Sequence, residues 1–332
     1  MGHLELSEAA TGDWSGRRVL VTGAAGLLGR AVCAELDRRG ATVLGLDIAW
    51  AGFDGPAPRA LTQVDGDIRD RPLVERILRE DRPDTLIHLA AQTLVGPAVE
   101  DPIDTFSHNV EGSWTILDAC RTVGSPERIV VASSDKAYGD AGGRPYVETM
   151  ALRPDHPYDA SKAMTDLLAR TYARTYGLPV AITRCANLYG GGDLNWSRIV
   201  PGTIRSVLEN EAPVIRSDGT FVRDYLFVDD AARAVLVLAE AVGRREEIRG
   251  EAFNFAAGQR LTAIEMAERI LRVMGSSLRP RILATSRNEV PVQRVSAARA
   301  RRELGWRPTV TLERGLAQTI EWYRGHLARA AR

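Results

Sequence analysis

The chain has 332 residues, with 43 Lys plus Arg against 43 Asp plus Glu, so its formal net charge is zero. This balance is atypical of proteins that bind nucleic acids or anionic membranes, since both partners attract a basic excess. No stretch approaches the roughly 20 apolar residues of a membrane span, and the N-terminal residues lack the apolar core of a signal peptide. The three cysteines are scattered through apolar segments, which is typical of reduced core thiols and not of a disulfide frame or a metal site. We therefore expect a soluble, cytoplasmic protein, and a chain of this length predicts two lobes.

Residues 17–190 alternate between short apolar runs and helix-length segments. Strands are predicted at 17–23, 42–47, 84–91, 128–134 and 178–190, and helices at 27–40, 72–81, 105–124 and 158–176. This alternation predicts parallel β-α-β units and hence an α/β fold with a doubly wound, Rossmann-type sheet. Beyond residue 190 the alternation loosens, with a strand at 223–228 and helices near 229–242, 262–274 and 312–327. We expect an N-terminal extension (1–16), a dinucleotide-binding domain (17–190) and a smaller lobe formed mainly by 191–332, with the chain crossing between lobes.

Three glycines with GxxGxxG spacing separate the first expected strand from the first expected helix: Gly23, Gly26 and Gly29. Glycines at these places allow a tight turn, close approach of a pyrophosphate and close packing of helix on strand. The helix then begins near Leu27 and Leu28, where unpaired N–H groups face the phosphates. Three glycines can also be simple turn residues, but the strand before them and the helix after them favour a dinucleotide site.

Two acidic residues follow strands in this half of the chain. Asp47 ends the second strand about 20 residues after the glycines, where a carboxylate accepts from the adenosine ribose hydroxyls. An acid there repels a 2′-phosphate, which predicts NAD and not NADP. Asp67 can receive the adenine amine while Ile68 packs on the ring; an ordinary loop cap is the equal alternative for Asp67.

Tyr158 and Lys162 lie four residues apart at the start of an expected helix, so both side chains share one face. Tyrosine, with an ordinary pKa of about 10, is a poor base at neutral pH. A neighbouring ammonium, together with the charge of an oxidised nicotinamide, favours the phenolate and lowers that pKa. Ser133 and Ser134 end the preceding strand and can hydrogen-bond a substrate alcohol. The set predicts a hydride-transfer site, with a solvated lysine beside a half-buried tyrosine as the alternative. His88, in an apolar strand, is expected to be a hydrogen-bonded core residue.

Five segments carry a resemblance to a known family: "TGAAGLLG", "HLAAQ", "SSDKAYG", "PYDASK" and "RCANLYGGGD". The chain resembles the extended short-chain dehydrogenase/reductases that act on nucleotide-activated sugars, from about Arg17 to "RRELGWRPTVTLERGL". The resemblance implies a Rossmann domain that holds NAD, a smaller C-terminal lobe that binds the nucleotide sugar, and a homodimer formed through the helices around 106–120 and 158–176. Burial of those helices within the monomer is the alternative.

The resemblance also assigns further residues to the two ligands. Those expected to contact NAD are Leu89, Ala90, Ala91, Asn109 and Ser133, besides the residues above. Those expected to contact the nucleotide sugar are Gln92, Asn187, Arg198, Arg223 and Arg294. Arginine suits this task because its planar guanidinium matches phosphate oxygens bidentately.

In the family that the chain resembles, the residues after this strand differ between enzymes of different reaction type. In this chain they are Ser134, Asp135 and Lys136. The commonest 4,6-dehydratases carry a hydroxyl residue, Asp and Glu there, whereas CDP-glucose 4,6-dehydratases are similar to this chain in having Ser-Asp-Lys. That resemblance implies that Tyr158 takes the C4-hydroxyl proton and that Asp135, its pKa raised by burial, protonates the leaving C6 hydroxyl. Lys136 is then the base at C5, an ammonium against the enolate oxygen, or the holder of a water.

Three functions remain open at this stage. The leading one is an NAD-dependent nucleotide-sugar 4,6-dehydratase, and the second is a 4-epimerase of the UDP-glucose/galactose type, in which Asp135 and Lys136 only bind. A non-catalytic NAD-sensing scaffold is the third, and the presence of both Tyr158 and Lys162 disfavours it. A surface turn is the alternative for Asp135 and Lys136.

Overall fold

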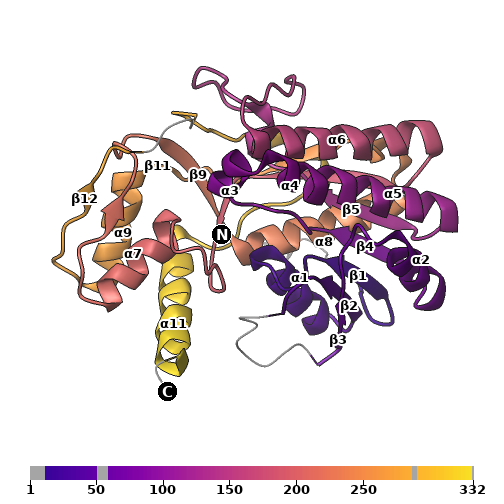
Figure 1. Ribbon diagram of the computed structural model, residues 1–332, viewed down its shortest axis with the longest axis horizontal. Coiled ribbons are helices and arrows are strands. Elements are labelled where there is room, and N and C mark those ends of the chain that lie inside the picture. Colours follow the sequence, from indigo (N-terminus) through magenta and orange to yellow (C-terminus); the bar gives the residue numbers. More distant parts are fainter. Residues whose placement is uncertain (1–11, 51–58, 286–289, 331–332) are drawn as a thin grey trace, which may run out of the picture.

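The apolar runs of the N-terminal half form a seven-stranded parallel sheet in the computed structural model, which describes residues 12–50, 59–285 and 290–330 (Figure 1). The strand order is β10-β6-β5-β4-β1-β2-β3. The strands are β1 (Arg18–Thr22), β2 (Thr42–Asp47), β3 (Leu61–Asp65), β4 (Thr85–His88), β5 (Arg128–Ala132), β6 (Val180–Cys185) and β10 (Ala252–Phe255). The central strands are buried at nearly every position, because helices cover both faces of a parallel sheet. The predicted doubly wound α/β fold is confirmed.

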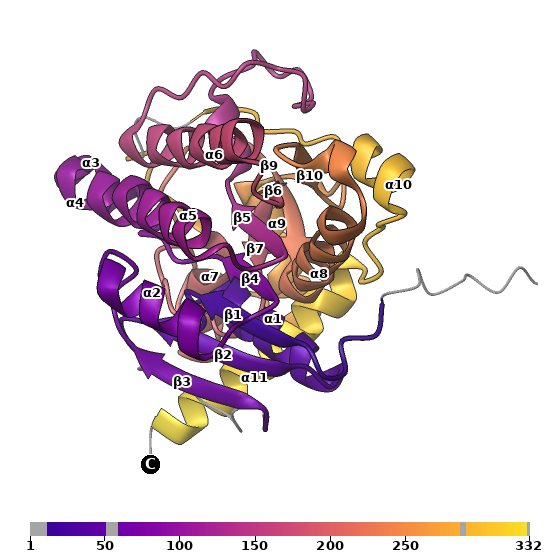
Figure 2. The ribbon, with the colours of Figure 1, turned by 90° about the vertical axis from the view of Figure 1, so that its right-hand side faces the viewer.

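Helices cover the two faces of this sheet unequally (Figure 2). One face carries α1 (Leu27–Arg38) and α8 (Val228–Arg244), which pack against each other, and the opposite face carries α2 (Arg71–Glu80), α5 (Gly112–Val123) and α6 (Pro157–Tyr176). Ahead of α5 lie α3 (Val95–Glu100), α4 (Pro102–Phe106) and the π-helical turn η1 (Ser107–Glu111). The single helix predicted over 105–124 therefore contains a π-helical segment. Within it the Asn109 carbonyl accepts hydrogen bonds from the Ser113 and Thr165 hydroxyls.

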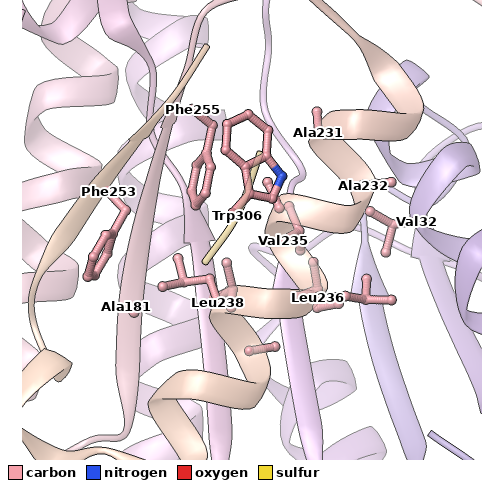
Figure 3. Packing of buried hydrophobic residues seen from close by; sticks show 14 of the residues in the cluster. Val32, Ala181, Ala231, Ala232, Val235, Leu236, Leu238, Phe253, Phe255 and Trp306 are labelled. Carbon is pink, nitrogen blue, oxygen red and sulfur yellow. The ribbon is translucent and has the colours of Figure 1, made fainter. Parts of the chain in front are cut away.

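The chain beyond residue 190 returns to the large sheet before it ends. β10 adds to the sheet beside β6, and α8 covers the sheet next to β5 and β6. Trp306 packs where β10 and α8 meet. Its ring lies edge-on against Phe255, with ring centroids 5.0 Å apart, beside the apolar side of α8 (Figure 3). Both α8 and β10 thus serve the dinucleotide-binding half although they come from the C-terminal half.

The smaller lobe has its own core. A three-stranded sheet of β7 (Asn187–Tyr189), β9 (Val222–Phe227) and β11 (Arg260–Thr262) packs with α7 (Ile199–Leu208), α9 (Ala263–Met274) and α11 (Leu312–Ala330). A parallel pair, β8 (Val214–Ile215) and β12 (Arg281–Ile282), borders it. The remaining helical elements are η2 (Asp135–Tyr138), η3 (Glu246–Ile248) and α10 (Ala298–Leu304).

The described part of the N-terminal extension is anchored on α8. Trp14 is 1% exposed, and its indole N–H donates to Glu240 over 2.7 Å. Residues 1–11 lie outside the described residues. Among the described helices, none combines the length and the apolar character that crossing a membrane requires.

Candidate active site

The glycine turn has the geometry of a pyrophosphate cradle. Gly23 has a φ of +71°, and a Cβ there would lie 2.6 Å from the backbone nitrogen of Ala90. At Gly29 a Cβ would lie 2.0 Å from the carbonyl oxygen of Gly23. The helix that contains Gly29 can therefore pack this close to the glycine turn only if this residue is glycine. Helix α1 begins at Leu27 with no side-chain cap, which leaves its first N–H groups for an anionic ligand. These residues fit a dinucleotide.

Asp47 and Asp67 lie at the carboxyl ends of neighbouring strands. Asp47 accepts from the Ala25 N–H over 2.9 Å, which ties the glycine turn to the end of β2. Asp67 accepts from both the backbone and the guanidinium of Arg69, whose hydrogen bonds lower the pKa of this carboxyl. The loop cap considered for Asp67 is therefore present in the structure, and the same side chain borders the cavity described next. Ile68 is 6% exposed.

A cavity of about 1270 Å³ runs from this cradle to the smaller lobe. It is large enough for a dinucleotide and a nucleotide sugar together, because single-ligand sites take about 300–1,000 Å³. Its lining includes nearly all of the predicted site residues: Gly23, Gly26, Leu27, Leu28, Gly29, Asp47, Asp67, Ile68, Leu89, Ala90, Ala91, Gln92, Ser133, Ser134, Asp135, Lys136, Tyr158, Lys162, Asn187, Arg198 and Arg223. The fold thus brings residues from both lobes to one site.

Asn109 and Arg294 are not among the lining residues. Asn109 is buried on η1; it accepts from the Gln92 N–H over 2.7 Å and donates to the Gln92 carbonyl and to the Ser161 hydroxyl. It therefore holds the loop after β4 against helix α6 and acts on the cavity through Gln92. The Nε of Arg294 is buried without a hydrogen-bond partner among the described residues, and the Arg294 carbonyl accepts from the Tyr146 N–H.

Tyr158 and Lys162 enter the cavity from the first turns of α6. Ser134, at the end of β5, lies near the Tyr158 hydroxyl and lowers its pKa. Ser133 donates instead to the Lys162 carbonyl over 3.1 Å, which fixes α6 to the same strand end. The two serines therefore have different tasks, since Ser134 faces the tyrosine and Ser133 holds the helix.

Burial dominates the ionisation of this pair. It raises the pKa of Tyr158 to about 12, and the charge of Arg198 is the largest opposing effect. Burial lowers the pKa of Lys162 to about 8, against the pull of Asp166. We expected Lys162 and the charge of oxidised nicotinamide together to lower the pKa of Tyr158; in the protein alone this pKa stays raised.

Asp135 has the environment that a carboxylic acid donor needs. Its side chain is 2% exposed, and this burial raises its pKa to about 6, against the charges of Lys136 and Arg223. Ser134 donates to Oδ1 over 3.3 Å, whereas Oδ2 has no hydrogen-bond partner among the described residues. The pKa shift predicted for Asp135 is confirmed in direction and cause, and its burial contradicts the surface-turn alternative.

Lys136 and Lys162 are the two lysines of the whole sequence, because every other residue among the 43 basic ones is an arginine. Both border the cavity. Arginine carries a permanent charge, whereas lysine can lose its proton when its environment changes. A chain that uses arginine everywhere else but lysine at these two places indicates that an amine is needed there. This signal was present in the sequence, and motif analysis missed it.

Polar side chains from the smaller lobe complete the cavity. Arg223 on β9 is 8% exposed and donates to the Val222 carbonyl over 3.0 Å. Arg198 precedes α7 and pairs with Asp193 at 3.2 Å. The Nδ2 of Asn187 is buried without a partner among the described residues, which leaves a donor for a ligand. On the other side, Gln92 is held by the Thr105 hydroxyl at 3.0 Å.

Asp159 also borders the cavity, although motif analysis did not single it out. It is 3% exposed, and burial raises its pKa against the charge of Lys136. Its position next to Tyr158 was the available signal. His88 is the expected core histidine: it is hydrogen-bonded to the Thr22 and Ser113 hydroxyls, and burial lowers its pKa to about 3.

A doubly wound fold with a glycine cradle and a Ser-Tyr-Lys set lining the same cavity defines a dinucleotide-dependent enzyme. Residues 19–256 match the model of the NAD dependent epimerase/dehydratase family, to which the chain belongs. NAD is accordingly its cofactor.

Individual relatives include both chemistries of the family. The chain is 32% identical to the dTDP-glucose 4,6-dehydratase of Neisseria meningitidis, covering 92% of this chain and 93% of that one. A dTDP-glucose 4,6-dehydratase of Streptomyces venezuelae, solved with NAD, is 31% identical, with a TM-score of 0.83 and coverage of 94% and 98% of the two chains. An epimerase of Methanothermobacter thermautotrophicus is 27% identical, with a TM-score of 0.88 and coverage of 96% and 95%. The dehydratases among these relatives are named as dTDP-glucose enzymes, so they do not support the expected resemblance to the CDP-glucose type.

Proposed function

We propose that this protein is an NAD-dependent nucleotide-sugar 4,6-dehydratase, a hydro-lyase that converts an NDP-hexose to its 4-keto-6-deoxy form. The observation that carries this proposal is the buried Asp135 carboxyl, with its raised pKa, beside the Tyr158–Ser134 pair. A 4-epimerase only oxidises C4 and reduces it again, so it needs no acid that protonates a leaving hydroxyl. The dehydratase relatives, at about a third identity over nearly the whole chain, support the same conclusion.

The residues then act in sequence on the sugar. Tyr158, as phenolate, removes the proton of the C4 hydroxyl. Bound NAD supplies the hydride acceptor for C4 and later the hydride donor for C6. The C4 ketone acidifies the C5 hydrogen, Lys136 removes that hydrogen as a proton, and Asp135 protonates the C6 hydroxyl so that water leaves. Lys136 then returns a proton to C5 as C6 is reduced. Arg198 and Arg223, at the smaller lobe, hold the pyrophosphate side of the substrate.

Among the three roles considered for Lys136, we propose the base. A positive charge that only stabilises the enolate or positions a water could be supplied by arginine, which is the basic residue at every other position of this chain. A base must be able to lose its proton, which arginine does not do. The variant Lys136→Arg keeps the charge and removes the base. It should form bound NADH in a single turnover yet fail to incorporate solvent deuterium at C5, and normal deuterium incorporation would contradict the base role.

The substrate and the reaction class are tested together. The protein is incubated in deuterated buffer with dTDP-, CDP-, UDP- and GDP-glucose, and the products are analysed by mass spectrometry and NMR. A dehydratase gives a 4-keto product that has lost one water and carries deuterium at C5. An epimerase gives a product of unchanged mass without deuterium, which would favour the alternative 4-epimerase function. The Ser134-Asp135-Lys136 resemblance predicts CDP-glucose, whereas the named relatives predict dTDP-glucose, and the panel decides between them.

We further propose that the protein is a homodimer through α5 and α6. The outward sides of these adjacent helices expose Trp114, Met164 and Leu167, which are 47%, 44% and 54% exposed. Helix α6, with 20 residues, is about 30 Å long, so the two helices present roughly 600 Å², close to the roughly 800 Å² that each partner buries in a standard interface. A second copy, related by a two-fold axis, would cover this face. Light scattering should give twice the chain mass, and Leu167→Glu should give the mass of one chain; a wild-type monomer contradicts the proposal.

A further inference from the structure

Two elements bring the proposed catalytic groups to the cavity, and they serve different steps. Helix α6 carries Tyr158, which acts at C4, whereas η2 begins with Asp135 and Lys136, which act at C6 and C5. The three carbons are adjacent in one sugar, so elimination needs η2 at a fixed place relative to α6. This requirement rests on the proposed function. Residues that fix this spacing affect the reaction without contacting the substrate.

A buried ion pair joins α6 to the strand β6. Asp166 lies on α6, about one turn beyond Lys162, and Arg184 lies on β6. The Nε and Nη2 of Arg184 donate to the two carboxylate oxygens of Asp166 over 2.8 and 2.9 Å. The two side chains are 7% and 2% exposed. A bidentate pair of this kind fixes the orientation of the guanidinium as well as its position.

The third guanidinium nitrogen reaches η2. Arg184 Nη1 donates to the Tyr138 hydroxyl over 2.7 Å, and that hydroxyl donates to Asn254 Oδ1, on β10, over 2.8 Å. Tyr138 is the last residue of η2 and is buried, and the guanidinium carbon lies 4.8 Å from its ring centroid. At the other end of η2, the Ser134 hydroxyl accepts from the Lys136 N–H over 3.2 Å. All three guanidinium nitrogens of Arg184 thus take part in holding η2 to α6 through β6.

This network lies behind the cavity. Thr183 and Cys185, on either side of Arg184 in β6, line the cavity, whereas Arg184 and Tyr138 are not among the described residues that line it. The alternation of side chains along a strand accounts for this difference. A buried ion pair is by itself weak evidence for stability, because the cost of taking both charges out of water offsets their attraction. The network is therefore placed to fix two elements of the site, and it is not placed to touch a ligand.

We propose that Tyr138 and Arg184 are positioning residues for the elimination step. Their hydrogen bond holds η2, with its acid and its base, at the distance from Tyr158 that the sugar requires. Loss of the Tyr138 hydroxyl leaves the ion pair of Arg184 intact, so α6 keeps Tyr158 in place while η2 loses its side-chain bond to β6. Oxidation at C4 should then continue, and the proton transfers at C5 and C6 should slow.

The experiment is a single turnover of Tyr138→Phe with the nucleotide glucose that the panel identifies. This variant removes one oxygen and keeps the ring that stacks on Tyr146, with ring centroids 4.8 Å apart. The absorbance of bound NADH reports C4 oxidation, and mass spectrometry of quenched samples reports water loss. NADH should form at a rate within a few-fold of wild type, whereas water loss should slow about 100-fold, as a misplacement of about 1 Å at a reacting centre does. Bound NADH should therefore accumulate.

A second variant and a control accompany Tyr138→Phe. Arg184→Lys keeps a cation beside Asp166 but has no planar fork that serves Asp166 and Tyr138 together, so it should show the same accumulation of NADH. Ile77→Val is the control for a loss of stability alone, because Ile77 is buried on α2 and is not among the described residues that line the cavity. It should lower Tm slightly and leave both rates near those of wild type.

The outcomes separate the positioning role from the proposed function. A wild-type product of unchanged mass overturns both. If the wild type loses water, a folded Tyr138→Phe that slows both steps by the same factor, or that turns over like Ile77→Val, overturns the positioning role alone. If Tyr138→Phe does not fold by circular dichroism, the same two rates of Arg184→Lys decide. If neither variant folds, the network only holds the fold together, and the inference is wrong.

Discussion

Replacing Asp135 by asparagine should stabilise the fold while it removes the acid. Burial raises the pKa of Asp135 from 3.8 to about 6. In the window between these values the folded protein binds more protons than the unfolded chain, so stability falls as pH rises through it. Above pH of about 6 both states carry the charge, and the buried carboxylate costs the folded state about 3 kcal/mol for a shift of about two pKa units.

The asparagine of the Asp135→Asn variant would keep the shape of the side chain and its hydrogen bond with Ser134, but it carries no charge to bury. The variant should therefore be more stable than wild type by about 3 kcal/mol at pH 8 and nearly equal to it at pH of about 4. With an entropy of unfolding of about 2.1 cal/mol/K per residue, a chain of 332 residues shows this as a rise in Tm of about 4 °C.

The assay is thermal unfolding of both proteins from pH 4 to 8, with NAD absent from both samples. Activity is measured in parallel: Asp135→Asn should form bound NADH in a single turnover, while water loss nearly stops. A difference in Tm that is the same at pH 4 and pH 8, or a variant less stable than wild type at pH 8, would refute the assignment of a buried, destabilising charge at Asp135.

Three further expectations follow from the site. Tyr158→Phe should reduce turnover about 100-fold or more with little change in nucleotide-sugar affinity; a near-normal rate would contradict the hydride-transfer mechanism. Gly29→Ala should abolish NAD binding in calorimetry, since its Cβ would lie 2.0 Å from the Gly23 carbonyl oxygen, whereas Gly325→Ala on α11, outside the cavity lining and with only the side-chain end of Arg329 near a Cβ, at 3.3 Å, should bind normally. Denaturing the purified protein should release NAD, and recovery of mainly NADP would contradict the role of Asp47.

The sequence by itself determined the fold class, the NAD cradle and the Tyr158–Lys162 pair. These features are local: strand and helix periodicity, glycine spacing and an i, i+4 pair all depend on residues near one another in the chain. The sequence also shows that Lys136 is unusual, because it is one of two lysines in a chain whose other basic residues are arginines.

The tertiary structure decided which of these residues act on one another. Ser134 and Tyr158 come close because β5 and α6 pack together, and the raised pKa of Asp135 follows from its burial, against the charge of Arg223 from the smaller lobe. Asn109 is hydrogen-bonded to Gln92, β10 joins the large sheet from the far half of the chain, and α8 packs on that sheet. Burial, ionisation and hydrogen-bond partners depend on contacts between residues distant in sequence, and local sequence patterns do not predict those contacts.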